Sequence, residues 1–273
     1  MRIISWNINR RVKDNPEQLQ ALQTYNPDIV ALQEVMKNAL PNISDGLRRF
    51  GLVHIEESVE LATQEGNQYS GELIASRWPL ERFPSHIFDI PYPELAVSVL
   101  VDSPWGNFEV HTIHIPNGSG AGWDKITTCE GIFNRQIQQS GTSQIICGDL
   151  NTPQAETPDG QIVTWGQELL NGKATVWGKW KGDTGERWDR GERNLLQGLS
   201  AIDVVDIFRA LHGYNIQEFS YYRDKKDKTS GVRFDHILAS RYLNPITCRY
   251  IHEWREQNLS DHSAIEGVFA PSS

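Results

Sequence analysis

Six short apolar runs in this chain begin or end beside a polar side chain that is capable of chemistry. The runs are RIISWNI, DIVALQ, FEVHTIH, QIICGD, RFDHIL and SAIEGVF. Their polar residues are Asn7, Gln33, Glu34, His114, Asp149, Asn151, Asp235, His236, Asp261 and His262. Apolar runs of this length, rich in β-branched residues and bounded by turn formers, predict strands. Burying so many polar groups without partners would be costly, so they do not form a core pattern. The sequence therefore predicts a β-rich protein whose strand ends share a polar site.

The stretch ICGDLNTP, residues 146–153, shows the choice that this pattern leaves open. Asp149 and Asn151 lie two residues apart, so their side chains point the same way if the strand continues. Gly, Asp, Asn and Pro are also ordinary turn formers, and a simple turn is the alternative. The other strand ends favour a site.

The composition limits the location and the partners of the chain. Its 273 residues carry 26 basic and 35 acidic side chains, a net charge of −9. That balance argues against non-specific coating of nucleic acid but permits a local basic groove. The start MRIISWNINRR lacks the long apolar region of a signal peptide, and no apolar run approaches the length that spans a bilayer. We therefore expect a cytoplasmic protein with no membrane partner.

The order of the elements predicts one mixed α/β domain over residues 1–273. The first forty residues read as strand, helix and strand, and the runs between residues 52 and 115, FPSHIFDI among them, predict an antiparallel meander. A helix over 122–140 and another at LSAIDVVDIFRALHG follow, with strands between and after them. No linker or repeat divides the sequence.

Residues 152–198 differ from the rest because they are polar, rich in glycine and heavy in tryptophan, with lysines and arginines interleaved. We expect an irregular loop here, since long segments of this kind in compact domains are usually functional. Interleaved basic and aromatic residues suit a polyanion with stackable bases. A surface excursion with its own aromatic cluster is the alternative.

The polar strand ends offer oxygen ligands for a metal ion. Carboxylates come from Glu34, Asp149 and Asp261, and amides from Asn7 and Asn151. Oxygen ligands of this kind favour Mg²⁺, with Mn²⁺ as a possible substitute, over zinc. The three cysteines show no CxxC spacing, which also argues against zinc. The sequence predicts a hard divalent cation as cofactor.

Five motifs, WNIN, LQEV, GDLN, the Asp within RFDHILAS, and SDH, follow one another along the chain. In this order and at these intervals they resemble the endonuclease/exonuclease/phosphatase superfamily, and its exonuclease III-like nucleases in particular. The resemblance runs from residue 2 to about 269. It implies a four-layered α/β/β/α sandwich, in which two mixed, mostly antiparallel sheets lie face to face with helices outside. It also implies metal-dependent hydrolysis of phosphoesters.

The same resemblance assigns roles to the strand-end residues. Glu34 resembles the principal metal ligand, with Asn7 as its neighbour and Asp261 as a second acid on the metal side. Asp149 resembles the acid that orients or deprotonates the attacking water, and Asn151 resembles the amide that holds a phosphate oxygen.

The histidines add to the resemblance, but they point to different members of the superfamily. His262 resembles the catalytic histidine, with Asp235 as the carboxylate that fixes its tautomer. The alternatives are a satisfied surface histidine and a pair of Asp235 with Arg233 or Arg241. His114 stands where abasic-site enzymes carry tyrosine, and in this it resembles pancreatic deoxyribonuclease. Glu72, in YSGELIAS, falls where that enzyme has a glutamate beside its histidine. We therefore expect a Glu72–His114 pair, with a strand-surface acid as the alternative.

Four aromatic residues resemble substrate contacts. Tyr221 and Tyr222 fall where exonuclease III-like enzymes place aromatics against an abasic sugar, and Tyr69 matches a tyrosine that contacts phosphate. Trp123 belongs to the loop IPNGSGAGWDK, which resembles a loop of those enzymes and flanks the expected site. Ordinary strand or loop aromatics are the alternative for each.

These observations predict a Mg²⁺-dependent nuclease or DNA-repair phosphodiesterase whose partner is nucleic acid, DNA above all. The alternative is a metal-dependent hydrolase of smaller phosphoesters, such as an inositol phosphate or the headgroup of sphingomyelin. A third hypothesis is a binding module that kept the fold and lost the chemistry. Loss of Glu34 or His262 would have marked such a module, and both are present.

Overall fold

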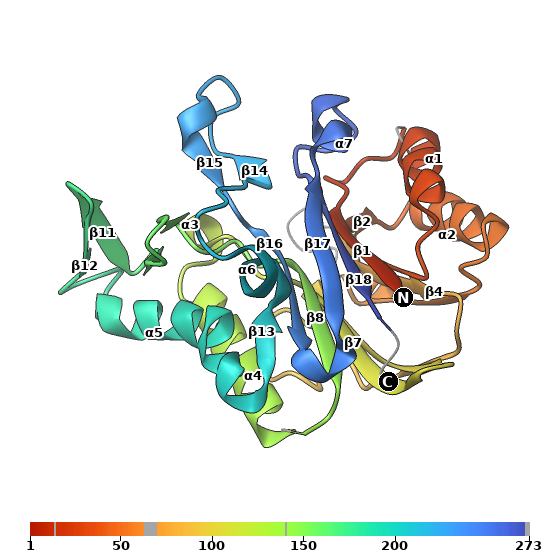
Figure 1. Ribbon diagram of the computed structural model, residues 1–273, viewed down its shortest axis with the longest axis horizontal. Helices are drawn as coiled ribbons and strands as arrows, with labels where there is room; N and C mark the ends of the chain where they lie inside the picture. The colour runs from red at the N-terminus through yellow and green to blue at the C-terminus, as the bar shows by residue number, and fades with distance from the viewer. Residues whose placement is uncertain (14, 63–69, 140, 271–273) are drawn as a thin grey trace.

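The computed structural model describes residues 1–13, 15–62, 70–139 and 141–270, and most of its strands form two six-stranded sheets (Figure 1). The first sheet has the order β17 (Pro245–Ile251), β18 (Ala264–Phe269), β1 (Arg2–Asn7), β2 (Ile29–Met36), β4 (Ser70–Ser76) and β3 (His54–Glu57). The second has the order β13 (Val204–Asp206), β16 (Asp235–Ser240), β8 (Gln144–Asp149), β7 (Gly106–His114), β6 (Ala96–Ser103) and β5 (Leu80–Arg82). Within the described strands, β1–β2 and β7–β8 pair in parallel and the other neighbours pair antiparallel. The predicted mixed, mostly antiparallel sheets are confirmed.

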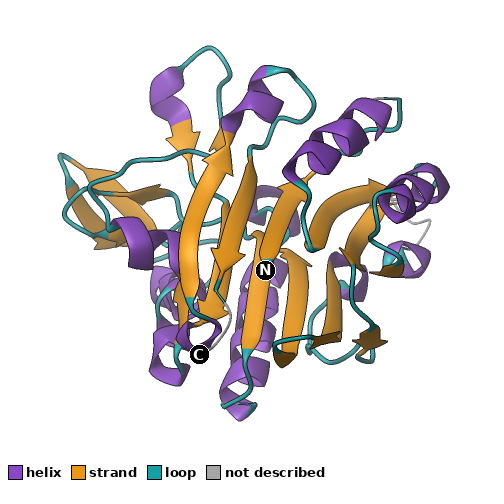
Figure 2. Ribbon diagram, turned by 45° about the vertical axis from the view of Figure 1, so that its right-hand side comes forward, coloured by secondary structure: helices purple, strands orange, loops and turns teal. Residues whose placement is uncertain are grey.

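Helices lie on the outer sides of the sheets (Figure 2). The longer ones are α1 (Asn15–Tyr25) and α2 (Leu40–Arg49) beside the first sheet, and α4 (Asp124–Gln138) and α5 (Gly185–Leu196) beside the second. The shorter ones are α3 (Gly118–Ala121), α6 (Ile207–His212) and α7 (His252–Glu256), with 3₁₀ turns at Val59–Leu61, Pro93–Leu95, Gly198–Ile202, Lys228–Ser230 and Arg241–Leu243. Among the described residues, no helix has the length and apolar character needed to cross a membrane.

Three apolar clusters separate the layers of the molecule. Ile3 of β1 and Ile145 of β8 belong to the cluster between the two sheets. Ile4, the next residue of β1, faces the other way and packs with Leu22 of α1, because successive strand residues alternate between faces. Leu195 of α5 belongs to the third cluster, on the outer side of the second sheet. Helix, sheet, sheet and helix thus follow one another, which confirms the predicted four-layered sandwich.

Strand register brings the polar strand ends together. In the first sheet Asn7 is the partner of Gln33. In the second sheet Asp149 has His114 on one side and Asp235 on the other. The first sheet also joins the two ends of the chain, since β1 lies between β2 and β18 (Figure 1). Residues far apart in sequence therefore meet along one edge of the sandwich.

The prediction that residues 152–198 are irregular is wrong. The segment forms the hairpins β9–β10 (Ala155–Glu156, Ile162–Val163) and β11–β12 (Gln167–Leu170, Lys173–Val176), followed by α5. Trp188, Glu192 and Leu195 are buried on α5 at intervals of three and four, the spacing of one helix face. The interleaved charged residues hid this periodicity in the sequence.

Two further element predictions are wrong for local reasons. The stretch FPSHIFDI forms no strand in the structure; Pro84 lacks a backbone donor, and Phe88 is buried edge-on against His111. The stretch LSAIDVVDIFRALHG is not one helix, because Asp203 adopts a φ of +65° and the chain then joins the sheet as β13. Asp206 next caps α6 by accepting hydrogen bonds from two backbone N–H groups.

Candidate active site

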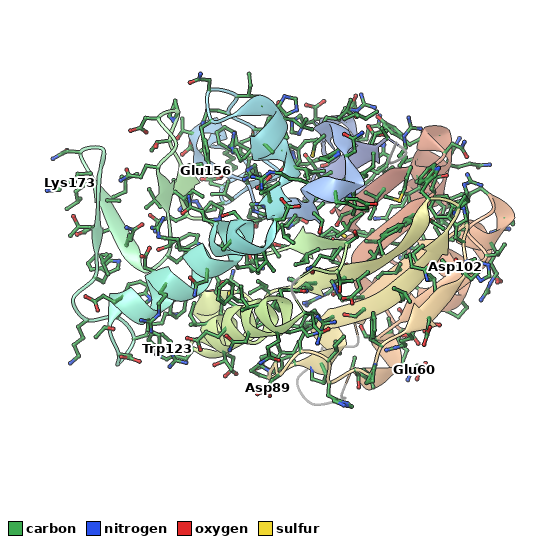
Figure 3. The ribbon with its side chains drawn as sticks, turned by 60° about the horizontal axis from the view of Figure 1, so that its bottom comes forward. Glu60, Asp89, Asp102, Trp123, Glu156 and Lys173 are labelled. Atoms are coloured by element: carbon green, nitrogen blue, oxygen red, sulfur yellow. The ribbon has the colours of Figure 1, made fainter. Side chains whose placement is uncertain are left out.

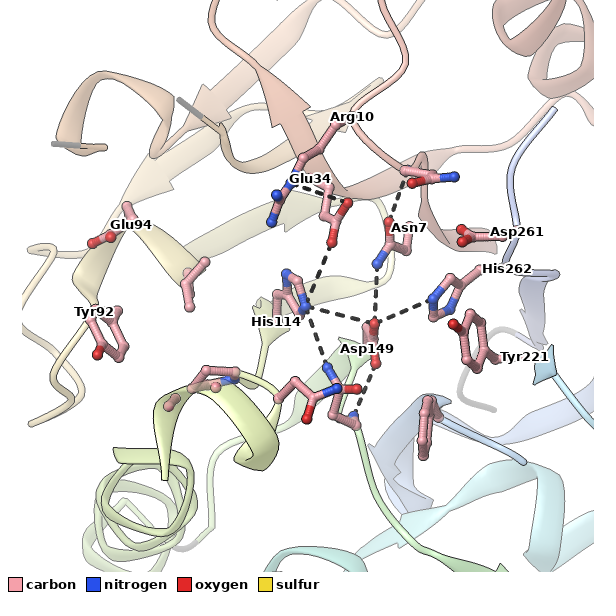
Figure 4. Close-up of a pocket in the computed structure, with 18 residues that line it drawn as sticks. Asn7, Arg10, Glu34, Tyr92, Glu94, His114, Asp149, Tyr221, Asp261 and His262 are labelled. Carbon is pink, nitrogen blue, oxygen red and sulfur yellow. Dashed lines mark hydrogen bonds and ion pairs between the residues drawn. The ribbon is translucent and has the colours of Figure 1, made fainter. Parts of the chain in front are cut away.

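Strand ends from both sheets line one pocket of about 660 Å³, which we name the catalytic pocket (Figure 4). Its lining includes eight residues that the sequence singled out: Asn7, Glu34, His114, Asp149, Asn151, Tyr221, Asp261 and His262. The structure therefore brings together most of the predicted site.

Asp149 lies at the centre of the catalytic pocket (Figure 4). Its Oδ2 accepts a hydrogen bond from Asn7 Nδ2 at 3.1 Å and lies 3.7 Å from Nε2 of both His114 and His262. Its Oδ1 accepts the backbone N–H of Asn151 at 2.9 Å. The nearly buried carboxylate of Asp149 thus lies between two imidazoles and accepts hydrogen bonds from the side-chain amide of Asn7 and the backbone amide of Asn151.

Two backbone features place the residues around Asp149. Gly148 has a φ of +137°, and a Cβ there would run into the backbone carbonyl of Ile113 on β7. Asn151 also lies in the left-handed region, with a φ of +50°, which asparagine tolerates better than most residues. Its Nδ2 donates to the carbonyl of Ile115 at 2.9 Å. The stretch GDLN is therefore a turn and a part of the site at once.

Glu34 reaches the catalytic pocket through an irregularity in β2. The pairing with β4 shifts between Leu32 and Val35, and Glu34 itself has a φ of +59°. Such bulges redirect side chains. Its carboxylate lies 3.9 Å from His114 Nε2 and 3.4 Å from Nε of Arg10. The neighbouring Gln33 lies within β2 and is completely buried.

His262 and Asp235 form the predicted pair, with Nδ1 of the imidazole 2.8 Å from a carboxylate oxygen. Asp235 is fully buried behind His262, and Tyr221 covers the imidazole at a ring distance of 4.8 Å. Burial lowers the pKa of His262, but the carboxylates of Asp235 and Asp149 outweigh it and raise the pKa to about 10. The imidazole is therefore charged at neutral pH, and both of its ring nitrogens donate.

The predicted Glu72–His114 pair is wrong. Glu72 is completely buried, and neither of its carboxylate oxygens has a hydrogen-bond partner among the described residues. It shares a face of β4 with Ile74 of the inter-sheet core. Burial raises the pKa of Glu72 well above its usual range, and the carboxylate of Glu34 adds to the rise. His114 instead lies near Glu34, Asp149 and Asn151.

Two other predicted contact residues, Tyr222 and Trp123, are not among those that line the catalytic pocket. Tyr222 lines a small neighbouring cavity, where the guanidinium of Arg255 lies 4.5 Å from its ring centroid. Trp123 packs edge-on against Trp188 at 5.1 Å. Tyr69 lies outside the described residues. Their roles stay predictions.

The catalytic pocket also contains residues that the sequence did not mark. Asn117 follows His114 after two residues and caps α3 with its side chain. Its position in the loop behind a site strand was an available signal. Tyr92 and Glu94 come from the turn before β6 and lie to one side of the pocket (Figure 4). No pattern in the sequence connects that turn with the site.

The oxygen donors of the catalytic pocket fit a magnesium-like cation. Among the described residues, no group of three or more histidine, cysteine, aspartate or glutamate side chains is close enough to enclose a metal ion. Mg²⁺ does not need such a cage, because it usually takes one or two carboxylates and keeps water and substrate phosphate as further ligands. Glu34, Asp261 and the amide of Asn7 line the pocket and are the residues that would hold such a cation.

Comparison with known proteins gives one family and one fold. The sequence profile of the Endonuclease/Exonuclease/phosphatase family matches residues 4–262. No curated protein matches the chain significantly.

Three solved structures illustrate the shared fold. An AP endonuclease from Archaeoglobus fulgidus is 20% identical with a TM-score of 0.71, covering 98% of this chain and 99% of that chain. The 3′ phosphatase NExo from Neisseria, bound to product DNA hairpin, is 20% identical with a TM-score of 0.69, covering 99% of both chains. The 3′-5′ exonuclease NExo from Neisseria meningitidis is 20% identical with a TM-score of 0.66, covering 98% and 99%.

Proposed function

Because the chain belongs to the Endonuclease/Exonuclease/phosphatase family, we propose that it is a divalent-metal-dependent hydrolase of phosphodiester bonds in nucleic acid, with DNA as the favoured substrate. The observation that carries the proposal is the placement of Asp149 between His114 and His262. In-line attack of water on phosphorus needs a group that orients the water and donors that neutralise the developing charge. The catalytic pocket holds both kinds of group around one point.

The electrostatics divide the roles between Asp149 and His262. His262 has a pKa of about 10, so at neutral pH it already carries its proton and cannot act as the base. Its Nε2–H is the donor for a phosphoryl or leaving oxygen. Asp149, 3.7 Å from that nitrogen, orients the attacking water and accepts its proton.

Two neighbouring side chains complete the binding of the phosphate. The carboxamide of Asn151 lines the catalytic pocket and lies 3.5 Å from His114 Nε2. Together they form a second pair of polar groups for the non-bridging oxygens, on the side of Asp149 away from His262. Glu34, with Asn7 and Asp261 beside it, would hold Mg²⁺ or Mn²⁺, which when bound polarises phosphoryl oxygens as a Lewis acid.

Nucleic acid is favoured over a small phosphoester by two lines of support. The structures with this fold include an AP endonuclease and a 3′ phosphatase bound to a DNA hairpin, which also supports a role in DNA repair. In addition, Arg10 lines the catalytic pocket, and Lys181 and Arg223 line an adjoining cavity, although the whole chain has a charge of −9. Local cations in an acidic protein suit a polyanion that is bound at one place.

The test is a hydrolysis panel with Mg²⁺ and, separately, with chelator. The panel holds duplex DNA with and without an abasic site, single-stranded DNA, RNA, a chromogenic phosphodiester, an inositol phosphate and sphingomyelin. We expect metal-dependent cleavage of nucleic acid, reduced about 100-fold or more in Asp149→Asn, because that change removes the proton acceptor while keeping the shape.

Asp203→Asn is the matched control. Asp203 is exposed, pairs with Arg241 and precedes β13, whose Val204 lies opposite Ser240, the end of β16 remote from Asp235. It should retain full activity. Cleavage of the small or lipid esters alone would refute the nuclease proposal in favour of the alternative, and absence of all hydrolysis would refute the enzyme itself.

A further inference from the structure

A second cavity, of about 430 Å³, adjoins the catalytic pocket and shares Asn117, Asn151, Tyr221 and Phe234 with it. We name it the tryptophan pocket. Its remaining lining comes from α3, α4, α5 and the segments around them: Gly118, Ser119, Lys125, Trp165, Trp180, Lys181, Trp188 and Arg223. Three indole rings and three cations thus stand directly beside the candidate site of phosphate chemistry.

Asn151, one of the four shared residues, connects the two pockets through its backbone and its side chain. The backbone carbonyl of Asn151 accepts hydrogen bonds from Lys125 Nζ at 2.8 Å and from Trp165 Nε1 at 3.1 Å. The side chain of the same residue lines the catalytic pocket. A ligand that bridges the pockets would therefore meet groups whose relative positions are fixed.

The walls of the tryptophan pocket are held rigidly by a buried carboxylate. Glu192 accepts hydrogen bonds from Trp188 Nε1 at 2.9 Å and from the backbone N–H of Trp165 at 2.8 Å, and it pairs with Lys125 at 2.6 Å. Trp180 meets the edge of Trp188 at 6.1 Å. Walls that are already ordered lose little entropy when a flat ligand enters. This is the arrangement of a preformed binding site.

Trp180 carries an unused donor into this arrangement. Its Nε1 is buried and has no hydrogen-bond partner among the described residues. Its ring stacks on Trp177 with a centroid distance of 5.6 Å and an angle of 14°. This stacking fixes the orientation of the Trp180 ring, which lines the tryptophan pocket.

The charges of the tryptophan pocket select among flat ligands. Aromatic cages also bind quaternary ammonium groups, but no described residue that lines this cavity carries a carboxylate. The charge of Lys125 is neutralised by its ion pair with Glu192. Lys181 lies 5.2 Å from the ring centroid of Trp188, and Arg223 lies 5.7 Å from the ring centroid of Trp165. These exposed cations at the rim oppose a cationic headgroup and favour an aromatic ring next to a phosphate.

We propose that the tryptophan pocket binds the base of the unstacked nucleotide next to the scissile phosphate. The inference rests on the proposed nuclease function and adds a substrate class to it: single strands or unpaired strand ends whose bases are intact. Indoles stack on any base because every base has a π face, so the selection is for the presence of a base and not for its identity. A nucleotide inside a duplex would have to leave the stack to enter.

Binding in chelator tests this pocket without depending on hydrolysis. The probes are two fluorescein-labelled 10-mers of equal charge, one all-thymidine and one built entirely from abasic tetrahydrofuran units, measured by fluorescence anisotropy. We expect the chain to bind the thymidine 10-mer at least about 5-fold more tightly, since one stacked base contributes on the order of 1–3 kcal/mol. Trp180→Leu and, separately, Trp165→Leu should reduce this ratio to near one.

Two further variants separate stacking from general effects. Lys181→Gln should weaken both 10-mers by the same factor, because the two probes carry the same phosphate charge and the change removes a cation that lines the pocket. Trp105→Leu is the matched control, since Trp105 is a partly exposed indole at the β6–β7 turn. Asp102, three residues before it, lies on the opposite side of the molecule from Trp123 in Figure 3. This control should leave the ratio unchanged.

The outcomes distinguish this inference from the function on which it rests. Equal affinity of the unmodified chain for the two 10-mers would overturn the base pocket, as would an unchanged ratio in Trp180→Leu or competition by phosphocholine. If the ratio behaves as expected but added Mg²⁺ brings no cleavage, the pocket stands and the proposed hydrolysis fails.

Discussion

Replacing Asp235 by asparagine tests the electrostatic core of the catalytic pocket. The carboxylate lies 2.8 Å from His262 Nδ1, and together with Asp149 it raises the pKa of His262 from an ordinary 6.5 to about 10. A rise of that size corresponds to roughly 5 kcal/mol of preference for the charged imidazolium. Asp235→Asn removes the larger of the two attractive charges, so we expect the pKa of His262 to fall by 1 or more, toward its ordinary range.

The same change has a signed effect on stability. The folded pKa of His262 exceeds the unfolded one, so its contribution is fully present below about pH 6.5 and is lost as the pH rises through about 10. The free-energy difference between the unmodified chain and Asp235→Asn should therefore be largest near pH 6. It should shrink toward pH 10.5, with a slope of at most about 1.4 kcal/mol per pH unit.

The measurement combines urea unfolding between pH 5.5 and 10.5, in chelator, with an NMR titration of the histidine rings. Taking the difference between the two proteins removes groups that titrate equally in both. A free-energy difference that stays constant across this range would refute the reasoning, as would an imidazole of His262 that titrates near pH 6.5 in the unmodified chain. His262→Gln identifies the resonance.

Three further substitutions follow from buried contacts. Gly148→Ala should lower the free energy of unfolding by about 2 kcal/mol or more in urea titrations, because the added Cβ meets the Ile113 carbonyl at a strained φ; full stability would show that β7 and β8 separate easily. Glu72→Gln should lower the free energy of unfolding at pH 7 by no more than about 1 kcal/mol, because burial disfavours the charged form of Glu72 and raises its pKa well above its usual range. The unmodified chain should lose stability as the pH rises above about 4.5, and Glu72→Gln should lose less. Identical dependence of stability on pH in the two proteins would contradict the raised pKa. Lys125→Met leaves Glu192 buried without its cation and should cost about 3–5 kcal/mol, most of it recovered in the double variant with Glu192→Gln; an equally large loss in the double variant would show that packing, not charge, is at stake.

The layers and most of the catalytic pocket could be predicted from the sequence because both follow from strand periodicity. Alternation along RIISWN puts Ile3 in the core between the sheets and Ile4 under α1, and the polar residue at the end of a strand lies at the edge of a layer. His114, Asp149 and Asp235 then become neighbours through register alone.

The remaining features depend on contacts that local patterns do not encode. The bulge at Glu34 arises where β2 pairs with β4, and the tryptophan pocket depends on Lys125 meeting Glu192, 67 positions later in the sequence. The prediction of a Glu72–His114 pair was wrong because a match to a family motif does not show how deeply a side chain is buried between the sheets. Glu72 points toward the core between the sheets, on the same face of β4 as Ile74, and the period-two alternation of the strand would have indicated this.

The central position of β1 in its sheet has a consequence for the moment at which activity first arises during synthesis. Asn7 is translated well before residues 264–269, and only these residues supply the antiparallel neighbour of its strand. Two residues just before this strand also belong to the site: His262, and Ser260, whose hydroxyl donates a hydrogen bond to the backbone carbonyl of Asn7. A growing chain therefore cannot assemble the catalytic pocket until residues 260–269 have been translated.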